Sequence, residues 1–96
     1  MSAVEIFRDK LVLGPTELVE VVIWQVPTPV PPSEHDFKYR LVYVRDGKRI
    51  VGYDNERGKG DHKHVGGTEV TYTFTTLERL LADFEADVAA IRGGPI

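Results

Sequence analysis

The dipeptide Asp46-Gly47 separates two runs of residues, 37–44 and 48–54, that have the composition of β-strands. Asp-Gly is a strong signal for a two-residue hairpin turn, because both turn positions need a positive φ angle that glycine adopts readily. The two runs must then lie side by side in opposite directions. This hairpin therefore restricts the chain to folds that contain an antiparallel sheet.

The same turn predicts the register of the hairpin. A two-residue loop puts Arg45 opposite Lys48 and, counting back along both strands, Tyr39 opposite Asp54. Tyr39 and Arg40 then lie beside the residues that follow the second strand. A β-bulge would shift this pairing by one residue.

Further strands are expected on both sides of the hairpin. The segment 18–26 is rich in β-branched residues and apolar on both faces, which is typical of a strand inside a sheet. It would pair with 11–13 across a Gly-Pro turn. Residues 70–74 alternate between apolar and polar side chains and predict a last strand with one buried face. Residues 1–10 fit either a strand or a helical turn.

One helix follows the strands. Thr75 with Glu78 three residues later resembles a capping box, and Gly93-Gly94-Pro95 ends the segment, so we expect a helix over 76–92. Its apolar residues recur at helical spacing and form one stripe: Leu77, Leu80, Leu81, Phe84, Val88 and Ile91.

We therefore predict a single domain, 1–96, of the α+β class: an antiparallel meander of about five strands with one C-terminal helix packed on one face. One helix covers only one sheet face, which leaves the other for a partner or a second copy of the chain. The proline-rich segment 27–33 cannot be an internal strand, because proline donates no ladder hydrogen bond. We interpret it as a stiff connector between two hairpins rather than as a ligand for an aromatic groove.

Composition excludes several classes of protein. The chain has no cysteine, which rules out disulfides, cysteine–zinc sites and thiol nucleophiles and fits a reducing cytoplasm. Residues 1–10 lack the apolar core of a signal peptide, and no apolar run approaches the about 20 residues of a membrane span.

The net charge is −3, yet residues 37–64 hold eight basic and four acidic side chains, a local charge of +4. A local basic surface can hold an anion such as phosphate.

The stretch 53–64, Tyr-Asp-Asn-Glu-Arg-Gly-Lys-Gly-Asp-His-Lys-His, has the highest density of groups that move protons or hold phosphate. It contains two of the three histidines, whose unperturbed pKa lies near neutrality. Glycines on both sides of Lys59 suggest an irregular backbone. We therefore expect a polar loop that leaves the end of a strand, which is a common position for a functional site.

Several motifs together resemble a small prokaryotic family, the TumE-type toxins of type II toxin–antitoxin systems. They are Trp24-Gln25-Val26-Pro27, Gly52-Tyr53-Asp54-Asn55, Gly58-Lys59-Gly60, His62-x-His64, and a leucine-rich helix with Asp83-Phe84 and Asp87. The resemblance covers nearly the whole chain. It implies a cytoplasmic growth inhibitor encoded beside a cognate antitoxin, often one with a helix-turn-helix DNA-binding domain. The resemblance by itself does not identify any catalytic residues.

Two chemistries fit the polar stretch. The first is a metal-independent endoribonuclease, in which His62 and His64 transfer protons, Lys59 stabilises the extra negative charge of the transition state, and Asp54 orients one imidazole. This chemistry needs no cofactor. The groups expected to bind the RNA substrate are Tyr53, Asn55, Arg57 and Arg40.

The second chemistry is a divalent-metal site. On an extended segment His62 and His64 point to the same side, and a carboxylate from Asp54 or Asp61 would complete a plausible ligand set. A third reading is not enzymatic. An exposed sheet face would serve a binding module that inhibits or regulates a target, and such a module would lose its effect on changes across a broad surface. A polar loop without any site is the plainest alternative for these residues.

Overall fold

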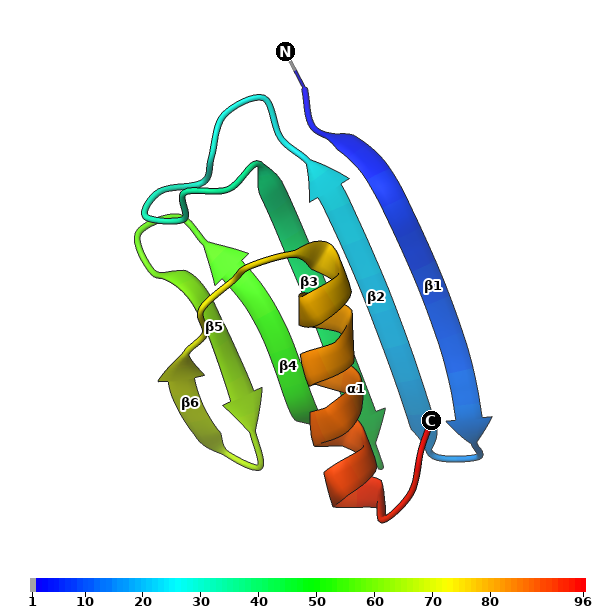
Figure 1. The fold of residues 1–96 in the computed structure, drawn as a ribbon. Helices are drawn as coiled ribbons and strands as arrows, with labels where there is room; N and C mark the ends of the chain where they lie inside the picture. The colour runs from blue at the N-terminus through cyan, green and yellow to red at the C-terminus, as the bar shows by residue number, and fades with distance from the viewer. Residues whose placement is uncertain (1) are drawn as a thin grey trace.

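The computed structural model describes residues 2–96, which form one antiparallel sheet and one helix. The strands follow one another across the sheet in chain order, each paired with the next, and the helix lies across one face (Figure 1). Their bounds are β1 Val4–Gly14, β2 Glu17–Gln25, β3 Phe37–Arg45, β4 Lys48–Glu56, β5 Gly60–Val65, β6 Thr68–Thr71 and α1 Leu77–Arg92. The predicted α+β meander with a C-terminal helix on one face is confirmed, with six strands where about five were expected.

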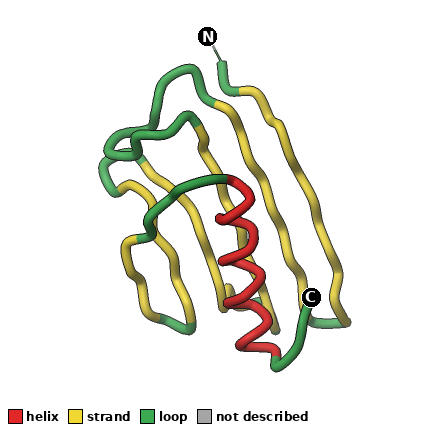
Figure 2. The backbone as a smooth tube through the Cα atoms, viewed as in Figure 1, coloured by secondary structure: helices red, strands yellow, loops and turns green. Residues whose placement is uncertain are grey.

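The sixth strand comes from the stretch 53–64, which was predicted to be a loop. Its first four residues complete β4 and its last five lie in β5, so only the three residues 57–59 turn (Figure 2). Gly58 and Gly60 take positive φ angles of 82° and 80° and make this tight turn feasible. The glycines therefore mark a hairpin, not an irregular loop, and both histidines lie in β5.

The other differences lie at the ends of the sheet. Residues 4–14 form one continuous strand, where only 11–13 was predicted, and most of this edge strand is exposed. At the opposite edge β6 ends at Thr71, and Tyr72 and Phe74 continue in an extended connector that leads to α1. Tyr72 is still buried, as its alternation predicted.

The core lies between the sheet and α1. Leu80, Phe84 and Val88 are the most deeply buried residues of the helix, each 1 % exposed or less, and they pack on apolar side chains of β2, β3 and β4. The helix begins one residue later than expected. Its N-cap is Thr76, which accepts a hydrogen bond from the backbone N–H of Arg79 at 3.1 Å, so the predicted box of Thr75 with Glu78 is wrong.

Each of the four tyrosines is buried, and each donates its hydroxyl hydrogen bond to a carboxylate. The pairs are Tyr39 with Asp61, Tyr43 with Glu17, Tyr53 with Asp87, and Tyr72 with Asp83. Asp83 and Asp87 project from α1, so one of these bonds ties the helix to β4 and the other ties it to the connector that follows β6.

The register of the central hairpin decides which side chains share a face. The pairs Val44–Arg49 and Arg45–Lys48 follow the prediction, but a bulge opposite Tyr43 shifts every later pair by one residue. Asp54 therefore faces Arg40 rather than Tyr39. Because alternate residues point to opposite faces, Asn55 now lies on the helix side of the sheet and Asp54 on the other side.

The proline-rich connector folds back over the β4–β5 turn. The backbone N–H of Gly58 donates to the carbonyl of Pro31 at 2.7 Å, and a β-carbon on Gly60 would lie 3.0 Å from the Pro32 ring. The connector is thus tied to the hairpin that carries the histidines. Among the described residues, no helix has the length and apolar character that crossing a membrane requires.

Candidate functional site

The histidines lie on the sheet face that α1 leaves uncovered, which we call the open face. Cross-strand pairing aligns two rows of side chains over this face. The first row is Arg8, Val22, Arg40, Asp54, His62 and Thr71, and the second is Lys10, Glu20, Val42, Gly52, His64 and Glu69. Directly paired residues are close enough for their side chains to touch. The register therefore sets acids beside both histidines, with Arg40 next along the first row.

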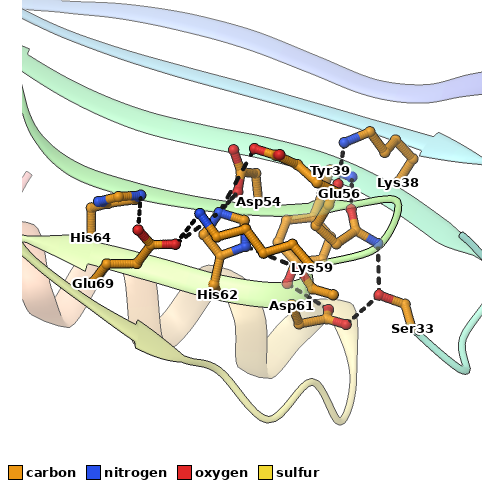
Figure 3. Close-up of polar contacts among 12 residues, drawn as sticks. Ser33, Lys38, Tyr39, Asp54, Glu56, Lys59, Asp61, His62, His64 and Glu69 are labelled. Carbon is orange, nitrogen blue, oxygen red and sulfur yellow. Dashed lines mark hydrogen bonds and ion pairs between the residues drawn. The ribbon is translucent and has the colours of Figure 1, made fainter. Parts of the chain in front are cut away.

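His62 is the centre of this arrangement and is only 3 % exposed. Its Nδ1 lies 3.0 Å from the carbonyl oxygen of Gly60. A carbonyl can only accept, so Nδ1 carries the proton of the neutral ring and Nε2 presents a lone pair. That lone pair faces Asp54, whose Oδ1 lies 2.5 Å from Nε2 (Figure 3).

The contact between His62 and Asp54 is not an ordinary hydrogen bond. The two atoms are buried, they lack hydrogen-bond alignment with each other, and neither has a hydrogen-bond partner elsewhere in residues 2–96. Buried polar atoms without a partner are uncommon in native proteins, and each one calls for an explanation such as a functional role or a bound ion. This pair is the clearest sign of a site on the open face.

More charged groups surround the pair. Glu56 and Glu69 each place a carboxylate oxygen 3.9 Å from His62 Nε2, and Glu69 also lies 3.5 Å from His64 Nε2. Lys59 forms an ion pair with Glu69, whose hydrogen bond raises the pKa of Lys59 while that of Glu69 is lowered. The His62 and His64 rings lie 5.7 Å apart and nearly perpendicular. Lys59, His62 and Glu69 border a shallow depression of about 240 Å³.

The opposite side of β5 carries a second polar cluster, built on Asp61. Its carboxylate accepts hydrogen bonds from Ser33 Oγ at 2.5 Å, the Tyr39 hydroxyl at 2.6 Å and His35 Nε2 at 2.7 Å. Burial alone would raise the pKa of Asp61, but these three bonds outweigh it and hold the pKa below its usual value. The Phe37 N–H donates to His35 Nδ1, and the His35 ring stacks on Phe74 at 3.8 Å.

The two clusters differ in one decisive respect. Around Asp61, each of the polar groups just named has a partner of the right kind, so this cluster is satisfied as it stands and fixes the connector to the sheet. Around His62, a lone pair and a carboxylate face one another at 2.5 Å. The open-face cluster is therefore the candidate site, and the Asp61 cluster has a structural role.

The structure separates the residues that the sequence grouped together. Asp54, Lys59, His62 and His64 meet on the open face. Arg40 and the turn residue Arg57 are exposed, and no ion pair joins either to an acid in residues 2–96. Asp61 lies on the other face of β5, so of the two carboxylates considered as metal ligands only Asp54 reaches His62.

Tyr53 and Asn55 also lie on the helix side, where they serve the fold. Asn55 is fully buried and bridges two strands: its Oδ1 accepts from the Tyr39 N–H at 3.0 Å and its Nδ2 donates to the Phe37 carbonyl at 2.8 Å. Tyr53 is 1 % exposed and bonds to Asp87. Both side chains were predicted to bind the RNA substrate, and the structure places them in the interior with their hydrogen bonds made within the fold.

Sequence reasoning missed Glu56 and Glu69 as members of the site. The pairing of β5 with β6 places Glu69 in the site, because Glu69 lies opposite His64. The signal was the Gly66-Gly67 turn, which joins two short strands and brings the residues on either side together. Recognising that hairpin in the sequence would have placed Glu69 beside His64.

Comparison with known proteins gives one match. The model of a family described as "Toxin TumE" matches residues 3–92. No curated protein and no solved structure matches the chain. The matched segment runs through all six strands to the last residue of α1 and includes the whole open-face cluster.

Proposed function

The chain belongs to the TumE family of toxins, and from this premise we propose that it is the toxin of a type II toxin–antitoxin system and acts as a small endoribonuclease at the open-face cluster. The observation that carries the proposal is the His62–Asp54 pair on the uncovered sheet face, whose two facing atoms are buried and have no hydrogen-bond partner in residues 2–96. Natural proteins tolerate such an arrangement chiefly at functional sites.

The basic side chains beside the cluster favour a polyanionic substrate. Arg40 is exposed and pairs with Asp54 across strands, one strand spacing of about 4.8 Å from the site. The Arg49 side chain lies over Gly52, because a β-carbon there would come within 2.8 Å of Arg49 Cδ. Neither arginine forms an ion pair within residues 2–96. Both guanidinium groups are therefore free to hold the phosphates of a strand that crosses the face.

The chemistry proposed is cleavage of RNA through its own 2′-hydroxyl. His64, the more exposed histidine, accepts the proton of that hydroxyl as its oxygen bonds to phosphorus. The bond to the 5′ oxygen breaks, and water protonates this leaving group. The ammonium of Lys59 stabilises the negative charge of the phosphorane, and Asp54, against His62 Nε2, orients that ring. The products are a 2′,3′-cyclic phosphate and a 5′-hydroxyl.

Purified protein incubated with total RNA tests this proposal. The parent should cleave RNA, and Lys59→Ala should cleave on the order of a hundredfold more slowly, as when one transition-state donor is removed. Lys48→Ala is the matched control, because Lys48 is also an exposed lysine beside a hairpin turn but lies at the other end of β4. It should cleave like the parent.

The outcome also separates the enzyme from a non-enzymatic binding module. His62→Asn and His64→Asn, each shown by circular dichroism to be folded, should lose both RNA cleavage and growth arrest. Growth arrest that persists in both variants would contradict the proposal. The toxic effect would then have to come from binding through the broader sheet surface.

Membership in a toxin family implies an antitoxin partner in general. We propose that this partner is encoded in the adjacent gene, carries a helix-turn-helix DNA-binding domain, and neutralises the toxin in the cytoplasm by direct contact. Co-expression should restore growth and pull-down should recover the complex. A neighbouring gene product that neither binds nor relieves toxicity would refute this part. The uncovered face also leaves room for a homodimer, which sedimentation would detect.

A further inference from the structure

We propose that the open-face cluster holds one divalent transition-metal ion at His62 Nε2, with Asp54 as its first carboxylate ligand. The inference rests on the proposed function only for the ion's use in RNA cleavage; binding itself follows from the residues alone. Its starting point is the position of two lone-pair donors, Nε2 and Asp54 Oδ1, 2.5 Å apart in a buried setting. Something positive must lie between them.

A shared proton is a poor candidate for that charge. The ring N–H of a protonated histidine points along one direction in the ring plane, and Asp54 Oδ1 does not lie along it. A metal ion has no such restriction, because it sits at a distance of about 2.1 Å from each ligand and joins them at an angle. Coordination would require Asp54 to withdraw by less than about 1 Å, since two ligands of one tetrahedral ion lie about 3.3 Å apart.

The charges around His62 match a divalent ion. Asp54, Glu56 and Glu69 bring three negative charges within 4 Å of Nε2, and Lys59 offsets one of them. Two negative charges remain beside a neutral imidazole. An RNA phosphate would be repelled by such a group, whereas a divalent cation neutralises it and then attracts the phosphate. The proposed substrate and the observed charges become compatible only with a cation present.

The local geometry provides two sets of ligands that share His62. In one, the donor atoms of His62, His64 and Glu69 all lie within 4.8 Å of one another; in the other, those of Asp54, Glu56 and His62 do. The Nδ1–H bond to the Gly60 carbonyl orients the ring as the outer hydrogen bond of a metal-bound histidine does. Mixed imidazole and carboxylate ligands favour Mn²⁺, Co²⁺ or Zn²⁺ over Mg²⁺ and Ca²⁺, which prefer oxygen.

Titration of the full chain with Co²⁺, followed by visible absorption, tests for this site without RNA. The d–d absorption bands of bound Co²⁺ should reach saturation with the parent protein. Added Zn²⁺ should abolish them by displacing the Co²⁺. Asp54→Asn and Glu69→Gln should each weaken binding at least tenfold. Glu78→Gln removes an exposed carboxylate from the first turn of α1, away from the cluster, and should bind like the parent. The dichroism spectrum of each variant checks its fold.

The result that overturns the inference is a folded parent that binds no Co²⁺ at millimolar concentration, or affinity unchanged in both ligand variants. This failure is distinct from failure of the nuclease proposal. RNA cleavage by metal-free protein in chelator would refute the ion's use in cleavage and leave both the nuclease and the binding result intact. Saturable Co²⁺ binding without any RNA cleavage would leave the metal intact and refute the nuclease.

Discussion

Asp61→Asn should destabilise the fold substantially, although it changes only one oxygen to an amide. The aspartate accepts three charge-assisted hydrogen bonds, from Ser33, His35 and Tyr39. A hydrogen bond to a charged group contributes about 1.5–3 kcal/mol and a neutral one about 0.5–1.5 kcal/mol, so loss of the charge costs about 1 kcal/mol per bond. The three bonds give a loss of about 3 kcal/mol in unfolding free energy, or roughly 12–24 °C in Tm for a domain of this size.

The pH dependence of this loss gives a second check. The pKa of Asp61 is lowered in the folded state, so its contribution is present above the unfolded pKa of about 3.9 and is lost as pH falls through the folded pKa. Urea denaturation should show the full difference in unfolding free energy between parent and variant at pH 7, and a difference that decreases below about pH 4. Asp36→Asn is the control, because Asp36 is exposed, makes no side-chain hydrogen bond in residues 2–96, and should leave the midpoint unchanged. A difference in unfolding free energy between parent and Asp61→Asn that is under about 0.5 kcal/mol, or that does not vary with pH, would refute the reasoning.

Four other substitutions test separate parts of the account. Leu80→Ala should lower the free energy of unfolding, measured by urea denaturation, by about 2–5 kcal/mol, because the side chain is fully buried between α1 and the sheet; a smaller loss would argue against this core. Gly58→Ala should lower the free energy of unfolding by about 1–2 kcal/mol because of its positive φ angle alone. Gly60→Ala should lower it further, because its β-carbon would also press on the ring of Pro32 in the connector. Equal losses in the two variants would show that this contact does not constrain Gly60. Lys59→Met should tighten Co²⁺ binding several-fold by freeing Glu69, and weaker binding would contradict the proposed metal site.

Much of the fold follows from local patterns in the sequence. The Asp46-Gly47 turn, the β-branched strand at 18–26 and the apolar stripe of the helix each depend on residues close in the chain, and each appears in the structure. The register of the central hairpin does not follow in this way. A single bulge beside Tyr43 exchanges the faces of every later residue of β4, and nothing in the alternation marks its position.

The candidate site depends on that bulge. It turns Asp54 toward His62 and buries Asn55, although the two residues are adjacent and both polar. The residues of the cluster could be named from composition, because histidines, glycines and lysine concentrate between 53 and 64. Their separation into a satisfied structural network and an unsatisfied open-face pair needs the three-dimensional pairing of β4, β5 and β6.

RNA cleavage by Asp54→Asn and Asp61→Asn, compared at a temperature where both are folded, tests the central claim most directly. The account predicts opposite outcomes. Asp54→Asn should keep or raise the melting temperature, because it removes the charge of a carboxylate that faces the His62 lone pair without a hydrogen bond, and should lose cleavage. Asp61→Asn should melt early yet cleave RNA normally while folded. An active Asp54→Asn protein, or an inactive but folded Asp61→Asn protein, would show that the open-face cluster is not the functional site.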